Sequence, residues 1–144
     1  MLGNAIRIAL LCLLAGLAIT ADCPAFASGP DQPDQNVHLV EVTAKKYEFS
    51  PSPIRVKRGA KVRLKITALD RAHGFKISLY ADGAKATGPP GLVFNSQVDC
   101  FTLEKGTPTT VEFVAQSPGT YSFKCCNFCG ISHGGMKGKL IVEP

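Results

Sequence analysis

Apolar and polar residues alternate along most of the chain after residue 36, and a period of two is typical of β-strands. The strictest case is Lys61–Thr67, where Val62, Leu64 and Ile66 fall on one face and charged or polar residues fall on the other. Similar runs predict six more strands, at Val37–Ala44, Ile54–Lys57, His73–Leu79, Thr110–Ala115, Thr120–Cys125 and Gly138–Glu143.

The chain shows no convincing run of apolar residues at helical spacing. Turn-forming residues separate the predicted strands, and Tyr80–Asp99 contains enough Gly and Pro to predict a long loop. With 144 residues, 45% of them hydrophobic, the chain can bury one core. We therefore expect a single all-β sandwich of about seven or eight short strands.

The N-terminus has the pattern of a signal peptide. Arg7 precedes the uncharged run Ile8–Ala21, and Ala25-Phe26-Ala27 fits the small-x-small rule for cleavage. The expected organisation is a signal peptide at 1–27, a flexible leader at 28–36 and one domain at 37–144. A retained membrane anchor is the alternative, but the uncharged run is 14 residues long, and a spanning helix needs about 20.

The chain is basic, with a formal net charge of +5, and removing residues 1–27 takes away one positive and one negative charge. A basic surface can attract an acidic partner or an anionic surface, or it can simply be solvated. Nucleic-acid binding is not expected, because the basic residues are scattered and no basic motif studded with aromatics is present.

Four soft metal ligands lie within twelve residues near the C-terminus, in the pattern Cys125-x3-Cys129-x3-His133-x2-Met136. Two thiols, an imidazole and a thioether form a ligand set that suits copper rather than magnesium, calcium or manganese. Alternation along Thr120–Cys125 directs Cys125 toward the core.

Other residues complete the predicted site. His73, at the start of a predicted strand, is the best candidate for a ligand from a distant part of the chain, whereas His38 is expected to be an ordinary strand residue. The loop must curl to bring its ligands together, and we expect Gly130, Gly134 and Gly135 to supply the backbone freedom.

The chain from Val37 to Pro144 resembles the cupredoxins, and among them the CuA domains of cytochrome c oxidase subunit II and of nitrous-oxide reductase. The resemblance rests on the Cys125–Met136 motif, on His73-Gly74-Phe75 and on the C-terminal segment Met136–Pro144. It implies a Greek-key β-sandwich that binds two copper ions and relays single electrons.

The resemblance also implies a role for each ligand. Cys125 and Cys129 would bridge the two ions, His73 and His133 would be terminal ligands, and Met136 and the backbone carbonyl of Asn127 would be axial ligands. The protein would then not be an enzyme by itself, although it could be the electron-entry subunit of an oxidoreductase such as cytochrome c oxidase.

Two other functions remain open at this stage. His73, Cys129, His133 and Met136 could form a mononuclear blue-copper site, which would leave Cys125 without a role. A Cys-x3-Cys pair could also serve a periplasmic copper carrier or a thiol redox protein. In the electron-transfer interpretation, the partner would be a redox protein such as a cytochrome c or an oxidase or reductase subunit. The protein would be periplasmic or otherwise extracytoplasmic, with membrane association only if the N-terminal segment is retained.

Two further cysteines and the lack of tryptophan depart from the family pattern. Cys100 and Cys126 could form a disulfide if their Cα atoms lie about 4.4–6.8 Å apart, either could be a buried thiol, or Cys100 could supply an extra ligand. A disulfide between Cys125 and Cys126 is disfavoured, because it would remove a ligand. The chain has no Trp, so Phe128, Phe75 or Tyr121 would have to provide the aromatic group near the site.

Overall fold

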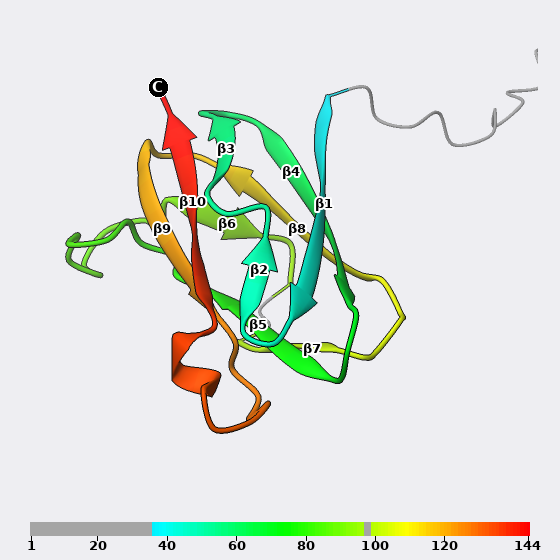
Figure 1. Ribbon diagram of the computed structural model, residues 1–144. Helices are drawn as coiled ribbons and strands as arrows, with labels where there is room; N and C mark the ends of the chain where they lie inside the picture. The colour runs from blue at the N-terminus through cyan, green and yellow to red at the C-terminus, as the bar shows by residue number, and fades with distance from the viewer. Residues whose placement is uncertain (1–35, 97–98) are drawn as a thin grey trace, which may run out of the picture. The chain divides into compact units, whose positions relative to one another are not determined.

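The computed structural model describes residues 36–96 and 99–144, which fold into two facing β-sheets (Figure 1). The predicted signal peptide and all but the last residue of the predicted leader lie outside the described residues. The described part contains ten strands, one turn of 3₁₀-helix and no α-helix, which confirms the predicted all-β class. None of its helices is long and apolar enough to cross a membrane.

The first sheet has the strand order β2-β1-β4-β8-β6. Its strands are β1 (Val37–Lys45), β2 (Glu48–Ser50), β4 (Lys61–Ala68), β6 (Leu92–Phe94) and β8 (Thr109–Ala115). β1 runs parallel to β4, and the other neighbouring pairs are antiparallel.

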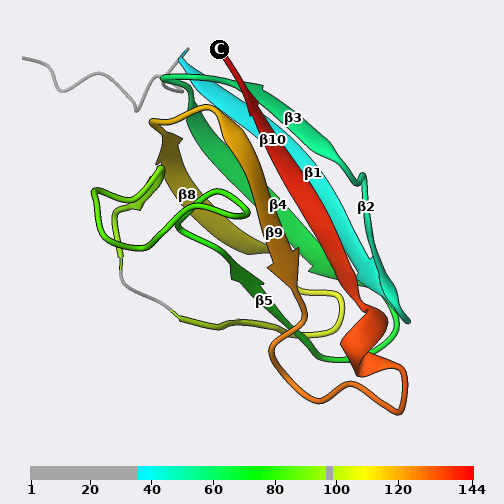
Figure 2. The same cartoon turned by 90° about the vertical axis from the view of Figure 1, so that its left-hand side faces the viewer.

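The second sheet has the strand order β3-β10-β9-β5-β7. Its strands are β3 (Ile54–Lys57), β5 (His73–Ile77), β7 (Phe101–Leu103), β9 (Gly119–Lys124) and β10 (Lys137–Glu143). Figure 2 shows β10, β9 and β5 side by side on one face of the molecule.

The apolar positions of the alternating runs form the core between the sheets. Val62, Leu64 and Ile66 on β4 are completely buried or nearly so, and the residues between them are more exposed. From the second sheet, Phe75 and Phe123 pack with ring centroids 5.3 Å apart, and Phe49 of β2 stacks edge-on against both. Burying these side chains is the main favourable contribution to folding.

Seven of the ten strands correspond to the runs predicted from the sequence. The other three, β2, β6 and β7, are three residues long, and so short a strand shows no reliable alternation. β6 lies inside the segment predicted as a loop, where Leu92, Val93 and Phe94 pair with β8.

The fold holds the ligand motif in a closed loop between β9 and β10. Lys124 ends β9, Lys137 begins β10, and these two residues face each other in the antiparallel ladder. The backbone N–H of Cys125 donates to the carbonyl of Met136 at 2.9 Å, which joins the two ends of the loop. The 3₁₀ turn η1 (His133–Gly135) lies within this loop, drawn in orange in Figure 1.

Candidate metal centre

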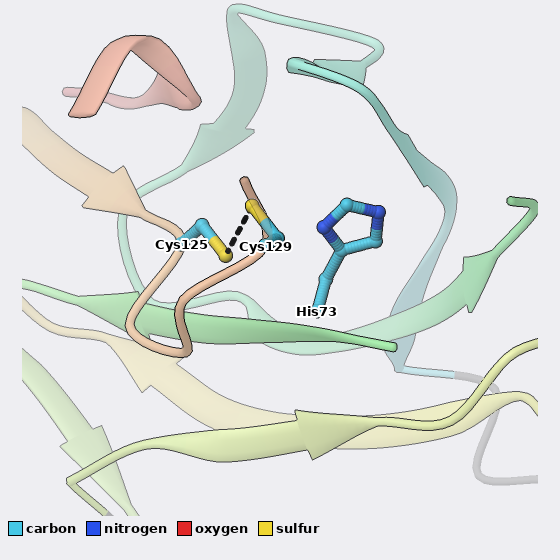
Figure 3. Close-up of side chains that lie close together, drawn as sticks. All are labelled: His73, Cys125 and Cys129. Atoms are coloured by element: carbon cyan, nitrogen blue, oxygen red, sulfur yellow. Dashed lines mark hydrogen bonds between the residues drawn. The ribbon is translucent and has the colours of Figure 1, made fainter. Parts of the chain in front are cut away.

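Three predicted ligands from two distant parts of the chain meet inside the sandwich. One ring nitrogen of His73 and the sulfurs of Cys125 and Cys129 all lie within 4.8 Å of one another, and all three residues are buried. His73 comes from the first position of β5, whereas Cys125 directly follows β9. Figure 3 shows the Nδ1 side of the imidazole ring facing the two sulfurs.

His73 is oriented by a carboxylate on its other nitrogen. Its Nε2 lies 2.7 Å from Asp70 Oδ1, and its Nδ1 is buried without a hydrogen-bond partner. Because an ionised carboxylate can only accept, Nε2 carries a proton, so Nδ1 is the ring nitrogen left to offer a lone pair to a metal. An orphaned buried nitrogen is costly unless something binds it, so this atom fits a metal ligand.

Asp70 is ionised over the physiological pH range. Burial by itself would raise its pKa, but the hydrogen bond from His73 and those from the backbone N–H groups of Lys46 and Arg71 lower the pKa to about 2. The carboxylate therefore holds the His73 tautomer that leaves Nδ1 available.

Cys125 lies where the prediction from strand alternation placed it, with its sulfur in the core. Its Sγ accepts a hydrogen bond from the Gly74 N–H at 3.3 Å, lies 3.1 Å from the backbone oxygen of Asn127, and is 3.5 Å from the sulfur of Cys129. These contacts fix the position of the Cys125 sulfur beside Cys129.

The sulfur of Cys129 lies close to the potential metal-binding atoms of His133 and Met136. It lies 3.5 Å from His133 Nδ1 and 3.9 Å from Met136 Sδ. Burial is the largest of the causes that raise the pKa of Cys129 to about 11, and the hydrogen bond and the charge of Cys125 are the smaller ones. The thiol is therefore protonated at neutral pH in the metal-free protein, and metal binding must release that proton.

The remaining predicted residues surround the three buried ligands. Met136 is completely buried, and the carbonyl of Asn127 faces Cys125. His133 is half-buried, and its ring centroid is 6.1 Å from that of Phe128, which is 82% exposed. His38 is exposed on β1 and takes no part in the cluster. All six predicted ligand residues therefore lie in or beside this cluster, whereas His38 does not.

Cys100 and Cys126 form a disulfide, with Cα atoms 6.0 Å apart. The alternatives of a free buried thiol and of Cys100 as an extra ligand are thereby excluded. Cys126 is half-buried, and only Cys125 and Cys129 remain as free thiols in the described residues. The sulfurs are thus divided between a disulfide and a pair of free, buried thiols.

The glycines only partly match the prediction. Gly130 has a φ of +132°, a conformation that favours glycine, but Gly134 and Gly135 lie in the 3₁₀ turn without a positive φ. The more constrained position is Gly74 on β5, where an added Cβ would lie 2.6 Å from the backbone nitrogen of Asn127 and 2.7 Å from Cys126 Sγ. The close approach of the loop to β5 therefore requires a residue without a side chain.

Sequence reasoning assigned no supporting role to three residues, although it named Gly74 as part of His73-Gly74-Phe75. Asp70 orients His73, Gly74 donates to Cys125, and the guanidinium of Arg71 donates to the Cys129 carbonyl at 3.3 Å. The only signal in the sequence was their proximity to His73, which does not distinguish them from ordinary turn residues.

The donor set fits copper. Two thiols, a bare imidazole nitrogen, a second imidazole and a thioether converge without a carboxylate oxygen among them, which disfavours magnesium and calcium. If copper is bound, Cys125, Cys129, His73, His133 and Met136 are the side chains that would hold it.

Comparisons with known proteins agree with this fold. The cupredoxin-like domain model matches residues 8–142, so the chain belongs to this family. Cytochrome c oxidase subunit 2 of Thermus thermophilus is 30% identical over 112 residues, covering 78% of this chain and 70% of the relative. Nitrous-oxide reductase of Cupriavidus necator is 29% identical over 108 residues, covering 72% of this chain but only 14% of that protein.

This chain shares its fold with solved structures of an oxidase domain and of a blue copper protein. The periplasmic domain of cytochrome oxidase subunit II from Bradyrhizobium japonicum aligns with a TM-score of 0.53 at 16% identity, covering 73% of this chain and 83% of that one. Auracyanin A, a "blue" copper protein of Chloroflexus aurantiacus, aligns with a TM-score of 0.55 at 16% identity, covering 74% and 99%. These structures therefore establish the fold alone.

Proposed function

We propose that this protein is an exported copper-binding electron-transfer protein with a binuclear CuA-type centre. The observation that carries the proposal is the pair of buried thiols, Cys125 and Cys129, 3.5 Å apart and facing the bare Nδ1 of His73. His133, Met136 and the carbonyl of Asn127 would complete the ligand set.

The residues around the site support electron transfer rather than catalysis. The donors are held by β5 and by the β9–β10 loop, and the hydrogen bond from Cys125 to Met136 closes this loop. Copper held by Cys125 and Cys129 would supply a one-electron redox couple. Half-buried His133, in contact with exposed Phe128, gives the buried site a short route to the surface. The protein would then relay electrons without being an enzyme by itself.

The position of Cys125 favours two copper ions over one. A mononuclear blue-copper site would use His73, Cys129, His133 and Met136 and would leave Cys125 idle. Cys125 is nevertheless buried among the donors, and its sulfur receives the Gly74 N–H. A thiol that is oriented in this way is better explained as a bridging ligand than as an idle core residue.

The relatives suggest the setting of this function. The relationship to oxidase subunit 2 supports association with an oxidase or reductase, with a cytochrome c or another subunit as redox partner. The Bradyrhizobium relative is named as a periplasmic domain, which supports an extracytoplasmic location for this chain. The signal peptide proposed at 1–27 is consistent with that location.

A copper carrier or thiol redox protein is the alternative from a different class. The proposal is tested by loading the protein with copper, cycling it electrochemically and challenging the Cu(I) form with a chelator. We expect a reversible one-electron couple and slow release of copper, because the donors are buried. Rapid transfer of copper to the chelator without a reversible couple would instead identify a carrier.

A further inference from the structure

The outer face of the second sheet carries three lysines in one row, which we call the lysine row. Lys76 on β5 stands directly opposite Lys124 on β9, and Lys124 stands directly opposite Lys137 on β10. The neighbouring residues Phe75 and Phe123 are buried, so alternation directs the lysines to the outer side. These three strands are adjacent in Figure 2.

Like charges placed directly opposite each other on neighbouring strands destabilise a sheet. The first sheet avoids this arrangement. There, Arg63 faces Glu112 and Lys65 faces Glu41, and each pair forms an ion pair. The first sheet therefore places opposite charges next to each other on adjacent strands. The lysine row instead places like charges next to each other, which suggests that it has a function.

Few carboxylates neutralise the row. Asp99 contacts Lys76 with its oxygen 2.5 Å from Nζ, although the Asp99 side chain is mostly exposed. Asp82 contacts Lys139, which lies two residues after Lys137 and outside the row, at 3.6 Å. Within the described residues, Lys124 and Lys137 are exposed and form no ion pair. Two unpaired positive charges thus remain beside the ligand loop.

The row borders the candidate metal centre. Lys124 immediately precedes Cys125, and Lys137 immediately follows Met136. A hollow of about 440 Å³ lies here, lined by Lys76, Lys124, Asp99, the Cys100–Cys126 disulfide and the loop residues Cys125, His133 and Gly134. The same loop exposes Phe128 and the fully exposed Ile131. Positive charge, a concave surface and apolar side chains therefore adjoin the half-buried imidazole of His133.

We propose that the lysine row and the adjoining hollow dock an acidic electron-transfer protein. Carboxylates of the partner pair with Lys124 and Lys137, while Phe128 and Ile131 make apolar contacts nearer to His133. Such charge complementarity mainly increases the association rate and selects the partner. This inference rests on the proposed electron-transfer function and adds the charge of the partner.

The test uses succinylated cytochrome c as an acidic probe and unmodified, basic cytochrome c as its counterpart. The full chain, with and without copper, is titrated with each probe at low ionic strength. We expect the acidic probe to bind more tightly than the basic probe, and added salt to weaken its binding. The variant Lys124→Gln/Lys137→Gln should bind the acidic probe about tenfold more weakly, because it loses two interfacial charge pairs.

The matched control is Lys57→Gln/Lys85→Gln, which removes the same charge from two exposed lysines outside the row. It should change the affinity less than about twofold. Equal weakening in both double variants would overturn the proposal, as would tighter binding of basic cytochrome c. Binding to phosphatidylglycerol vesicles through Lys124 and Lys137, without binding of the acidic probe, would also overturn it and indicate a lipid surface.

The two proposals can fail separately in this design. Binding by the copper-free chain tests docking even if the copper site proves to be mononuclear. The Lys124→Gln/Lys137→Gln variant could keep the copper spectrum and redox couple and bind the acidic probe as tightly as the parent does. That result would reject docking at the lysine row but would not contradict the proposed function.

Discussion

Asp70 Oδ1 lies 2.7 Å from His73 Nε2, and this contact leaves the opposite ring nitrogen bare and facing two buried sulfurs. The carboxylate contacts none of the predicted ligands except His73. It nevertheless determines which nitrogen of the imidazole can bind a metal, as carboxylate–histidine pairs do at other metal sites.

Replacing Asp70 should therefore weaken copper binding. Asp70→Ala removes the acceptor and frees the ring, and we expect a 10–100-fold loss of Cu(I) affinity in a competition assay. Asp70→Asn keeps an acceptor oxygen without the charge and should lose less. Asp82→Ala, which removes a carboxylate that contacts Ser122 and Lys139, is the control and should bind copper normally. An unchanged affinity in Asp70→Ala would show that His73 needs no such support.

Gly74→Ala should destabilise the protein by about 2 kcal/mol, because the new methyl group would overlap the backbone nitrogens of Asn127 and Cys126 and the Cys126 sulfur. These atoms belong to the backbone and the disulfide and cannot rotate away. Denaturant unfolding measures the change, and Gly88→Ala is the control, since nothing lies within 4 Å of its added Cβ. Equal stabilities of the two variants would mean that the loop shifts freely away from β5.

The Cys100–Cys126 disulfide should contribute stability without holding copper. The bridge links residues 26 positions apart in the sequence. By lowering the entropy of the unfolded chain, it should stabilise the folded protein by about 3.5 kcal/mol. Cys100→Ala/Cys126→Ala should lose roughly this amount in denaturant unfolding and keep the copper spectrum of the parent. Loss of the spectrum at a temperature where the variant is still folded would make the disulfide an essential brace of the ligand loop.

The two free thiols separate the binuclear from the mononuclear site. If both bridge two ions, Cys125→Ser and Cys129→Ser should each abolish the parent's visible and paramagnetic resonance spectra. In a blue-copper site, Cys129→Ser would still abolish the signal, but Cys125→Ser would leave it nearly intact. Met136→Leu serves as the comparison, because replacing an axial thioether of similar volume should alter the spectrum without abolishing it.

The sequence predicted the long strands and the ligand loop for a clear physical reason. β4 and β9 are buried on one face only, so burial imposes a period of two that can be read directly from the residues. The same period directed Cys125 toward the core, and Cys125 is buried there. The chemistry of thiols, imidazole and thioether then indicated copper.

Other features depended on tertiary contacts that no local pattern encodes. β6 and β7 are three residues long and exist because β8 and β5 provide pairing partners. The Cys100–Cys126 bridge needed the distance between two segments, which sequence spacing does not give. Asp70 looked like any turn residue until the fold placed it against His73, and the lysine row appeared only with the strand register.

The central claim is that two copper ions share the thiols of Cys125 and Cys129. Electron paramagnetic resonance of the copper-loaded, partly oxidised protein, combined with its copper content, tests this claim most directly. We predict two copper ions per chain and a hyperfine pattern from one unpaired electron shared equally by two copper nuclei. One copper ion per chain with the hyperfine pattern of a single nucleus would contradict the claim and identify a mononuclear blue-copper site.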